Sequence, residues 1–142
     1  MHKRDWQPLI PHQGAMCLLD EVLQWDNAGI HALARSHRNA ANPLRSDGML
    51  RSVHLCEYGA QAMAVHGGLL ARRDGKIAAP GFLVSLRAVR LHLARIDDLV
   101  DALDVRAEKL LAGDSGWQYA FHVECAGRLL AEGRAAVMQR TA

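Results

Sequence analysis

The pattern of apolar positions centres on one stretch, from Val53 to Ala71, in which Glu57 is the only formally charged residue. No face of this stretch is polar enough to face solvent, so the pattern predicts a helix that is buried on most sides. Ser52 is a suitable N-cap for this helix. Arg72 and Arg73 place cations at the C-terminus of the helix, where they oppose the negative end of its dipole.

The rest of the chain is typical of strands. Apolar runs or alternating apolar and polar positions predict strands over residues 16–25, 29–37, 82–93, 101–109, 116–125 and 128–140. Residues 38–51 are expected to form a loop, and residues 6–10 about one helical turn. Alternation places Trp117, Tyr119 and Phe121 on one strand face, in the sheet core or at a dimer contact. We therefore predict a single α+β domain over residues 1–142, with a curved antiparallel sheet of five to six strands wrapped around a long central helix.

Composition narrows the classes of function. The chain of 142 residues has a formal net charge of only +2, which gives no support for a nucleic-acid-binding surface. Its three cysteines lie in apolar runs without metal-ligand spacing, as expected for buried thiols in a cytoplasmic protein. The basic N-terminus is not followed by an apolar segment, so no signal peptide is expected. The central stretch contains Glu57, Gln61 and two histidines, which favours a core helix over a membrane span. The histidine spacing indicates no metal site, and we expect no cofactor.

Candidate chemistry lies on the central helix. His54, Glu57 and Gln61 are spaced i, i+3 and i+7 and therefore share one stripe. A lone carboxylate on an apolar helix is costly unless it is paired, hydrogen-bonded or protonated, so Glu57 is either a catalytic acid/base or a structural carboxylate. Gln61 either orients Glu57 or packs in the core. His54 is either a displaced base or a histidine that bonds to the backbone at the helix entry.

Three segments carry a resemblance to a known family. They are L-I-P-H-Q-G-A-M-C-L-L-D-E-V from Leu9 to Val22, E-Y-G-A-Q from Glu57 to Gln61, and G-F-L-V-S-L-R-A-V-R-L from Gly81 to Leu91. In their order and spacing they resemble hotdog-fold 3-hydroxyacyl-acyl-carrier-protein dehydratases, and more narrowly the dehydratase-like branch found in aryl-polyene-type clusters.

The resemblance implies a hotdog fold and a dimer with active sites at the subunit interface. It also implies that the acyl chain lies beside the helix and that the thioester carbonyl faces the helix N-terminus. At that terminus, Ser52 and Val53 would bind substrate, because free N–H groups and the helix dipole stabilise an enolate oxygen. His12, in the P-H motif, is expected to anchor its loop near the substrate.

One departure from the family concerns the catalytic base. Aligning N-P-L-R-S-D-G with the family pattern H-P-L-x-x-D-G places Asn42 where the loop histidine belongs. An amide has no useful basicity near pH 7, which implies impaired dehydration. Asn42 could still bind the thioester carbonyl or the substrate hydroxyl, because an amide both donates and accepts hydrogen bonds.

Three functions remain open at this stage. The first is a 3-hydroxyacyl-carrier-protein dehydratase of fatty-acid or polyketide-like synthesis. The second is a thioesterase that uses Glu57, and the third is a non-catalytic acyl-binding partner subunit. The expected partners are an acyl carrier protein or a coenzyme A thioester, together with a second copy of the chain or a related dehydratase. A set of cations could dock an acidic carrier, or could form an ordinary solvated face: Arg72, Arg73, Lys76, Arg87, Arg90 and Arg95.

Overall fold

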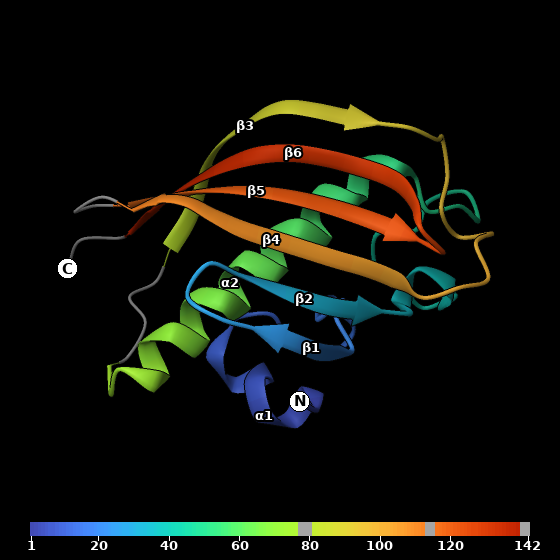
Figure 1. The fold of residues 1–142 in the computed structure, drawn as a ribbon. Helices are drawn as coiled ribbons and strands as arrows, with labels where there is room; N and C mark the ends of the chain where they lie inside the picture. The colour runs from blue at the N-terminus through green and yellow to red at the C-terminus, as the bar shows by residue number, and fades with distance from the viewer. Residues whose placement is uncertain (77–80, 113–115, 140–142) are drawn as a thin grey trace.

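A computed structural model describes residues 1–76, 81–112 and 116–139. One antiparallel sheet in the order β1-β2-β4-β5-β6-β3 forms the larger layer (Figure 1). Its strands are β1 (Glu21–Trp25), β2 (Gly29–Ala34), β3 (Gly81–Leu91), β4 (Leu103–Ala112), β5 (Gly116–Cys125) and β6 (Arg128–Gln139). The predicted strand over 128–140 is therefore present, although Arg140 lies outside the described residues.

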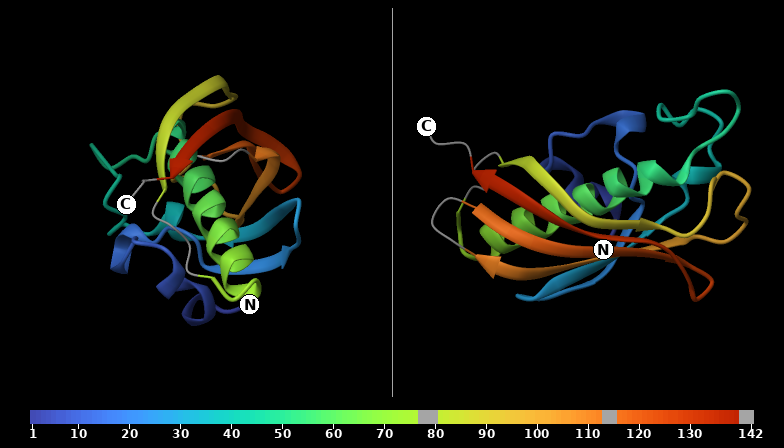
Figure 2. Two further views of the ribbon diagram at one scale, coloured as in Figure 1. Left: turned by 90° about the vertical axis from the view of Figure 1, so that its left-hand side faces the viewer. Right: turned by 90° about the horizontal axis from the view of Figure 1, so that it is seen from above.

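The long helix α2 (Leu55–Arg73) lies in the concave face of this sheet (Figure 2). The shorter helical segments are α1 (Lys3–Trp6) and the 3-10 helices η1 (Gln7–Leu9), η2 (Gly14–Met16), η3 (Ser36–Arg38) and η4 (Ser52–His54). The predicted architecture, a central helix wrapped by a curved antiparallel sheet, is confirmed.

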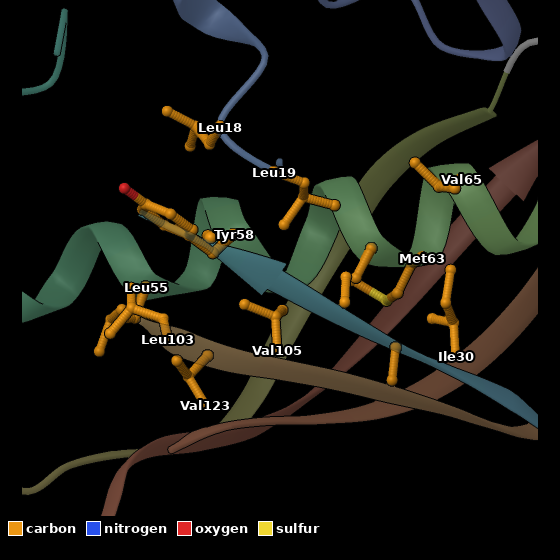
Figure 3. Close-up of a cluster of buried hydrophobic side chains, with 14 of the residues drawn as sticks. Leu18, Leu19, Ile30, Leu55, Tyr58, Met63, Val65, Leu103, Val105 and Val123 are labelled. Atoms are coloured by element: carbon orange, nitrogen blue, oxygen red, sulfur yellow. The ribbon is translucent and has the colours of Figure 1, made fainter. Parts of the chain in front are cut away.

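The core is formed where α2 meets the sheet on one side and the segment before β1 on the other. Figure 3 shows Leu18 and Leu19 above the helix, and Val105 and Val123 of the sheet below it. All four are at most 1% exposed, and Tyr58 of α2 is also fully buried between these layers. Burial of large apolar side chains from three segments at about 1.5–3 kcal/mol each is what fixes the helix in place.

The first strand begins later than the sequence predicts. Residues 16–20 were expected to belong to it, but β1 starts at Glu21. Met16 ends the 3-10 helix η2, and its carbonyl accepts from the side-chain amide of Gln61. The N–H of Leu18 donates to the side-chain carbonyl of Gln61, and the N–H of Asp20 donates to the carbonyl of Leu33. The apolar run is continuous there because Leu18 and Leu19 are buried beside α2, not because they lie in a sheet.

The strand predicted over 29–37 is also too long, because β2 ends at Ala34. The backbone N–H of Arg35 donates to Oδ2 of Asp20 at 2.6 Å, and the hydroxyl of Ser36 donates to the carbonyl of Leu18 at 2.7 Å. Because of these side-chain contacts, the chain leaves the hydrogen-bonding pattern of the sheet after Ala34 and enters η3.

The assignment of Ser52 as helix N-cap is wrong. A turn of 3-10 helix precedes α2, and Ser52 is its first residue. Its side chain makes no capping hydrogen bond, its backbone N–H donates to the carbonyl of Ala94 at 3.1 Å, and it is 4% exposed. Residues 51–52 instead pair with the chain after β3, Arg51 with Arg95 and Ser52 with Ala94, and this pairing positions the helix entry.

The sheet covers most of α2 but not all of it. Half-buried positions follow one stripe along the helix, and most of them are small: Cys56, Ala60, Ala64, Gly67 and Ala71. The prediction of burial on most sides is thus confirmed, and the stripe is the part of α2 that this chain alone leaves partly open.

The two edges of the sheet differ. At the β1 edge the backbones of Met1 and Val22 exchange hydrogen bonds, and His2 bridges to Glu21, so the N-terminal residues cover part of that edge. At the other edge, β3 pairs with β6 and has no further strand of the described chain beside it. Its exposed aliphatic side chains are Leu83, Leu86, Val89 and Leu91.

Candidate functional site

Glu57 lies in the first turn of α2, with its side chain 37% exposed. Nε2 of Gln61, one turn later, donates a hydrogen bond to Oε1 of Glu57 at 3.4 Å. Nε2 of His12 lies 3.3 Å from the same oxygen. The lone carboxylate of the apolar helix is therefore paired with two polar groups and still reaches solvent, which is a suitable state for an acid/base group.

Gln61 connects Glu57 to the segment before β1. Its side chain is fully buried. Its carbonyl accepts from the N–H of Leu18 at 2.8 Å, and its amide donates to the carbonyl of Met16 at 2.7 Å. Gln61 contacts Glu57 and holds the neighbouring loop, and its role in orienting Glu57 stays a prediction.

His12 reaches Glu57 from the loop between η1 and η2. Its side chain is 26% exposed, while its Nδ1 is buried and has no hydrogen-bond partner among the described residues. The sequence placed His12 near the substrate as an anchor but did not reveal its contact with Glu57. The two residues are far apart in the chain, and only the path of the loop brings them together.

The N-terminal end of α2 offers a hydrogen-bond donor. The N–H of Ser52 is used by Ala94, and the N–H of His54 donates to the carbonyl of Arg51. Within the described chain, the N–H of Val53 donates to no protein atom, and Val53 is 53% exposed. A free donor at the positive end of the helix dipole can stabilise a developing oxyanion.

Asn42 does not belong to this cluster. It is 5% exposed, and its amide donates to the carbonyl of Ser36 at 3.0 Å and to the hydroxyl of Tyr58 at 3.3 Å. Its carbonyl accepts from the N–H of Leu44 at 2.9 Å. Asn42 therefore fastens the loop to the interior of the subunit, since both amide hydrogens and one lone pair of the carbonyl are used within the described chain.

Asn42, Ser36 and Tyr58 form a second, buried polar cluster, and Tyr58 is the member that the sequence analysis did not identify. Its hydroxyl lies 2.8 Å from the Ser36 hydroxyl, and burial raises its pKa. It stands next to Glu57 in the E-Y-G-A-Q segment, but neighbouring helical residues point in different directions, so it faces the interior.

His54 shares the helix stripe with Glu57 but makes no hydrogen bond to Glu57 or Gln61 in the described structure. It is half-buried at the end of η4. The two predictions for His54, a displaced base and a histidine bonded to backbone, both stay untested.

The candidate carrier-docking cations do not gather on one surface. Arg72 donates to the carbonyl of Asp5 at 2.7 Å, and Arg73 bonds to Asn27 and lies over the ring of Trp25, all at the C-terminal end of α2. Arg95 lies beside Arg51 at the other end of the helix, which is about 28 Å away. The remaining members of the set are exposed: Lys76 after α2, and Arg87 and Arg90 on β3.

Other kinds of site find little support. Among residues 1–76, 81–112 and 116–139, no group of three or more His, Cys, Asp or Glu side chains could hold a metal ion. None of the described helices is long and apolar enough to cross a membrane. An open hollow of about 420 Å³ is lined by residues of β3, β5 and β6 and includes none of the Glu57 cluster.

The central helix, the curved sheet and the carboxylate at the helix start define a hotdog-fold protein of the acyl-thioester class. Comparison with family descriptions gives a match to the ApeP-like family, described as ApeP dehydratase, over residues 4–142. The chain therefore belongs to the ApeP-like dehydratase family, in agreement with the resemblance of its motifs.

Solved structures share the fold of this chain. The dehydratase heterocomplex ApeI:P from Xenorhabdus doucetiae has 25% identity and a TM-score of 0.85, over 95% of this chain and 90% of that chain. AziG from S. sahachiroi has 16% identity and a TM-score of 0.62, over 86% of this chain and 91% of that chain. A hypothetical thioesterase with coenzyme A from Streptococcus pneumoniae TIGR4 has 12% identity and a TM-score of 0.65, over 98% and 99%. The last two show the fold alone. Among curated proteins, none matches the chain.

Proposed function

We propose that this chain is one subunit of a dehydratase that acts on 3-hydroxyacyl thioesters, and that it contributes Glu57 to a site completed by a second hotdog subunit. The observation that carries the proposal is the contrast between Glu57 and Asn42. Glu57 is accessible and has one oxygen with no hydrogen-bond partner among the described residues, whereas the position of the family's histidine is occupied by a buried amide that is bonded to the chain itself through both its nitrogen and its oxygen. This chain thus supplies a carboxylate but no base beside it at position 42.

The reaction needs two proton transfers. A base removes the α-proton, the electron pair forms the C2–C3 double bond, and the C3 hydroxyl leaves as water with a proton from an acid. We assign the acid role to Glu57, because its carboxylate is accessible and the resemblance gives that role to the helix carboxylate. The N–H of Val53 suits the thioester carbonyl, on which negative charge develops as the α-proton leaves.

The β3 edge is the surface through which we expect the second subunit to bind. A long strand edge with exposed aliphatic side chains tends to pair with another chain unless it is covered. The opposite edge of this sheet, at β1, is partly covered by the N-terminal residues of the chain itself. The ApeI:P structure is a heterocomplex, which favours a related dehydratase as the partner. A second copy of this chain is the alternative.

The test is a mass-spectrometric assay with a panel of 3-hydroxyacyl-carrier-protein thioesters. The purified chain alone should remove water very slowly, and adding a related hotdog dehydratase as partner subunit should raise the rate. Glu57→Gln in this chain should lower the rate of the mixture by ~10²–10⁴-fold, the usual contribution of a positioned acid or base. Rapid dehydration by the chain alone would show that a base is already present, and His54 would be replaced next.

One observation favours a thioesterase as the second candidate. A single accessible carboxylate beside a free helix N-terminal donor is sufficient for Glu57 to activate water on a thioester. The same assay detects this, since hydrolysis releases a free 3-hydroxy acid. Rapid hydrolysis that depends on Glu57 would replace the dehydratase assignment.

A further inference from the structure

Three arginines lie together on the outer face of the sheet at its open edge, where β3 runs beside β6 (Figure 1). In the antiparallel pairing of these strands, Arg87 lies opposite Arg134, and Arg90 lies opposite Glu132. Glu132 and Arg134 alternate with buried residues of β6, so they and the residues opposite them point away from α2. Arg87, Arg90 and Arg134 are exposed, and we call them the outer-face arginines.

The charge of the outer-face arginines is not balanced within the described chain, where none of them forms an ion pair. Arg87 and Arg134 are like charges directly opposite each other, an arrangement that destabilises a pair of strands. Glu132, opposite Arg90, lies 3.4 Å from Nε2 of His92. The strand β3 itself contains no acidic residue. The open edge of the sheet is therefore positively charged on its outer face.

This charge disfavours a second copy of the chain at the same edge. Two identical subunits related by a two-fold axis use the same surface patch, so the outer-face arginines of one copy would meet those of the other. If two β3 strands paired about their midpoint, Leu86, the two copies of Arg87 would be diagonal neighbours, roughly 7–8 Å apart. The two copies of Arg134 would flank them, so that four guanidinium groups would lie side by side on four strands.

The backbone of β3 also disfavours pairing with a copy. The register of β3 against β6 shifts between Arg87 and Arg90, and Ala88 within this bulge has a φ of +53°, a left-handed value that alanine rarely adopts. Bulges and basic side chains are two devices by which edge strands avoid pairing with their own copies. The exposed aliphatic side chains of β3, among them Leu86, nevertheless favour a partner of some kind.

We propose that the outer-face arginines select the partner subunit: the β3 edge binds a hotdog subunit of different sequence, whose edge strand carries carboxylates on the outer face. Opposite charges on adjacent strands stabilise their pairing, whereas like charges repel, so the same three arginines favour this partner and reject a copy of the chain. The inference rests on the proposed function for the use of the β3 edge by a second subunit, but association can be measured without any activity.

The experiment uses a charge-reversed form of this chain as the acidic partner. The double variant Arg87→Glu, Arg90→Glu is mixed with wild type, and sedimentation velocity gives the Kd of the mixed pair and of each chain alone. The mixed pair should bind at least about tenfold more tightly than wild type binds itself, because several like-charge contacts become opposite-charge contacts. This advantage should shrink between about 0.05 M and 0.5 M NaCl, since salt screens exposed charges.

Two further variants serve as controls. Arg106 is exposed on the outer face but lies on β4, which β5 and β6 separate from β3, so Arg106→Glu mixed with wild type should bind no more tightly than wild type alone. Leu86→Lys in the wild-type chain should abolish the mixed pair if its contact is at the β3 edge. Circular dichroism of each variant checks that it is folded.

A mixed pair no tighter than wild type alone, or one that survives Leu86→Lys, would overturn the inference. Weaker binding of an acidic carrier protein by the double variant, with subunit association unchanged, would assign these arginines to carrier docking instead. Failure of the proposed function is a separate result. If the mixed pair forms but no preparation dehydrates 3-hydroxyacyl thioesters, the proposed function fails and the inference stands. Dehydration with a related partner, but no preference for the charge-reversed chain, would overturn the inference alone.

Discussion

Gly59 of α2 lies directly against the ring of Phe121 on β5. A Cβ at Gly59 would be 2.6 Å from Cδ2 of Phe121, closer than carbon atoms can approach. At the far end of the ring, a Cβ at Gly133 of β6 would be 2.9 Å from Cζ. The helix and the sheet approach each other this closely because both residues that face Phe121 lack side chains.

Gly59→Ala should therefore lower the free energy of unfolding, by about 1–3 kcal/mol, the usual cost of overpacking a core. Urea unfolding followed by circular dichroism measures this. Gly67→Ala is the matched control, because it lies in the same helix with nothing within 4 Å of the added Cβ. It should stabilise the protein by about 0.5–1 kcal/mol, since alanine loses less entropy than glycine in a helix. Equal effects of the two substitutions would show that α2 does not lie against Phe121 as described.

Buried His66 should make stability depend on pH. Nε2 of His66 donates to the carbonyl of Asp26 at 2.7 Å, so Nδ1 accepts from the Tyr119 hydroxyl at 2.8 Å and the ring is neutral. Burial lowers the pKa of His66 below 6.5, and it lowers the pKa of His37 in the same way. Below pH 6.5 the unfolded chain takes up protons that the folded chain does not.

The free energy of unfolding should thus be highest above pH 6.5 and fall as the pH decreases, with a slope of at most about 1.4 kcal/mol per pH unit for each histidine. Urea titrations between pH 8 and pH 5 measure the slope. His66→Leu should be less stable at pH 8, because Tyr119 and Asp26 lose their partner, but its slope should be smaller. An unchanged slope in His66→Leu would contradict a neutral buried His66.

Restoring the family's histidine should not restore a complete site. Asn42→His puts a larger ring into a position that is 5% exposed and loses hydrogen bonds to Ser36, Tyr58 or Leu44. We expect a loss of about 1–3 kcal/mol in stability and no gain in dehydration by the chain alone. Thermal unfolding and the thioester assay measure the two effects. A gain on the order of 10²-fold, the effect of a positioned base, would mean that position 42 faces the substrate after all.

The partner subunit should bind at the β3 edge of the sheet. Leu86→Lys places a charge on an exposed, aliphatic edge strand and should weaken the complex without unfolding the subunit. Leu23→Lys is the matched control, since Leu23 is similarly exposed on β1 at the opposite edge. Sedimentation of the chain with its partner gives the result. If only Leu23→Lys dissociates the complex, the interface lies at the β1 edge and the prediction is wrong.

Carrier-protein binding should depend on cations near the start of α2. Arg51 is exposed beside η4, whereas Arg73 lies sixteen residues beyond Glu57, about 24 Å along the helix. Charge reversal of Arg51 should weaken binding of an acidic carrier and reduce its salt dependence, and the same change at Arg73 should have little effect. Surface plasmon resonance at two salt concentrations compares them. A larger effect at Arg73 would place the carrier at the opposite end of α2, as the sequence alone had allowed.

The sequence by itself determined the architecture of this protein. The apolar stretch from Val53 to Ala71 has too little polar surface to face water, and β5 alternates strictly, so local patterns were enough to predict the helix and the sheet. The ends of elements were predicted less well. Residues 16–20 have the composition of a strand but are held by Gln61, and no pattern within the segment shows that.

The site was only partly accessible from the sequence. Spacing within one helix brought Glu57 and Gln61 together correctly, because residues one turn apart share a face. The contact of His12 with Glu57 and the use of Asn42 to fasten a loop depend on how distant segments pack. The six cations are close in sequence, yet α2 and β3 carry them to opposite ends of the molecule. Tertiary structure alone decided these relationships, because a polar group acts on what lies within hydrogen-bond distance, and the order of residues in the chain fixes that distance only within a single element.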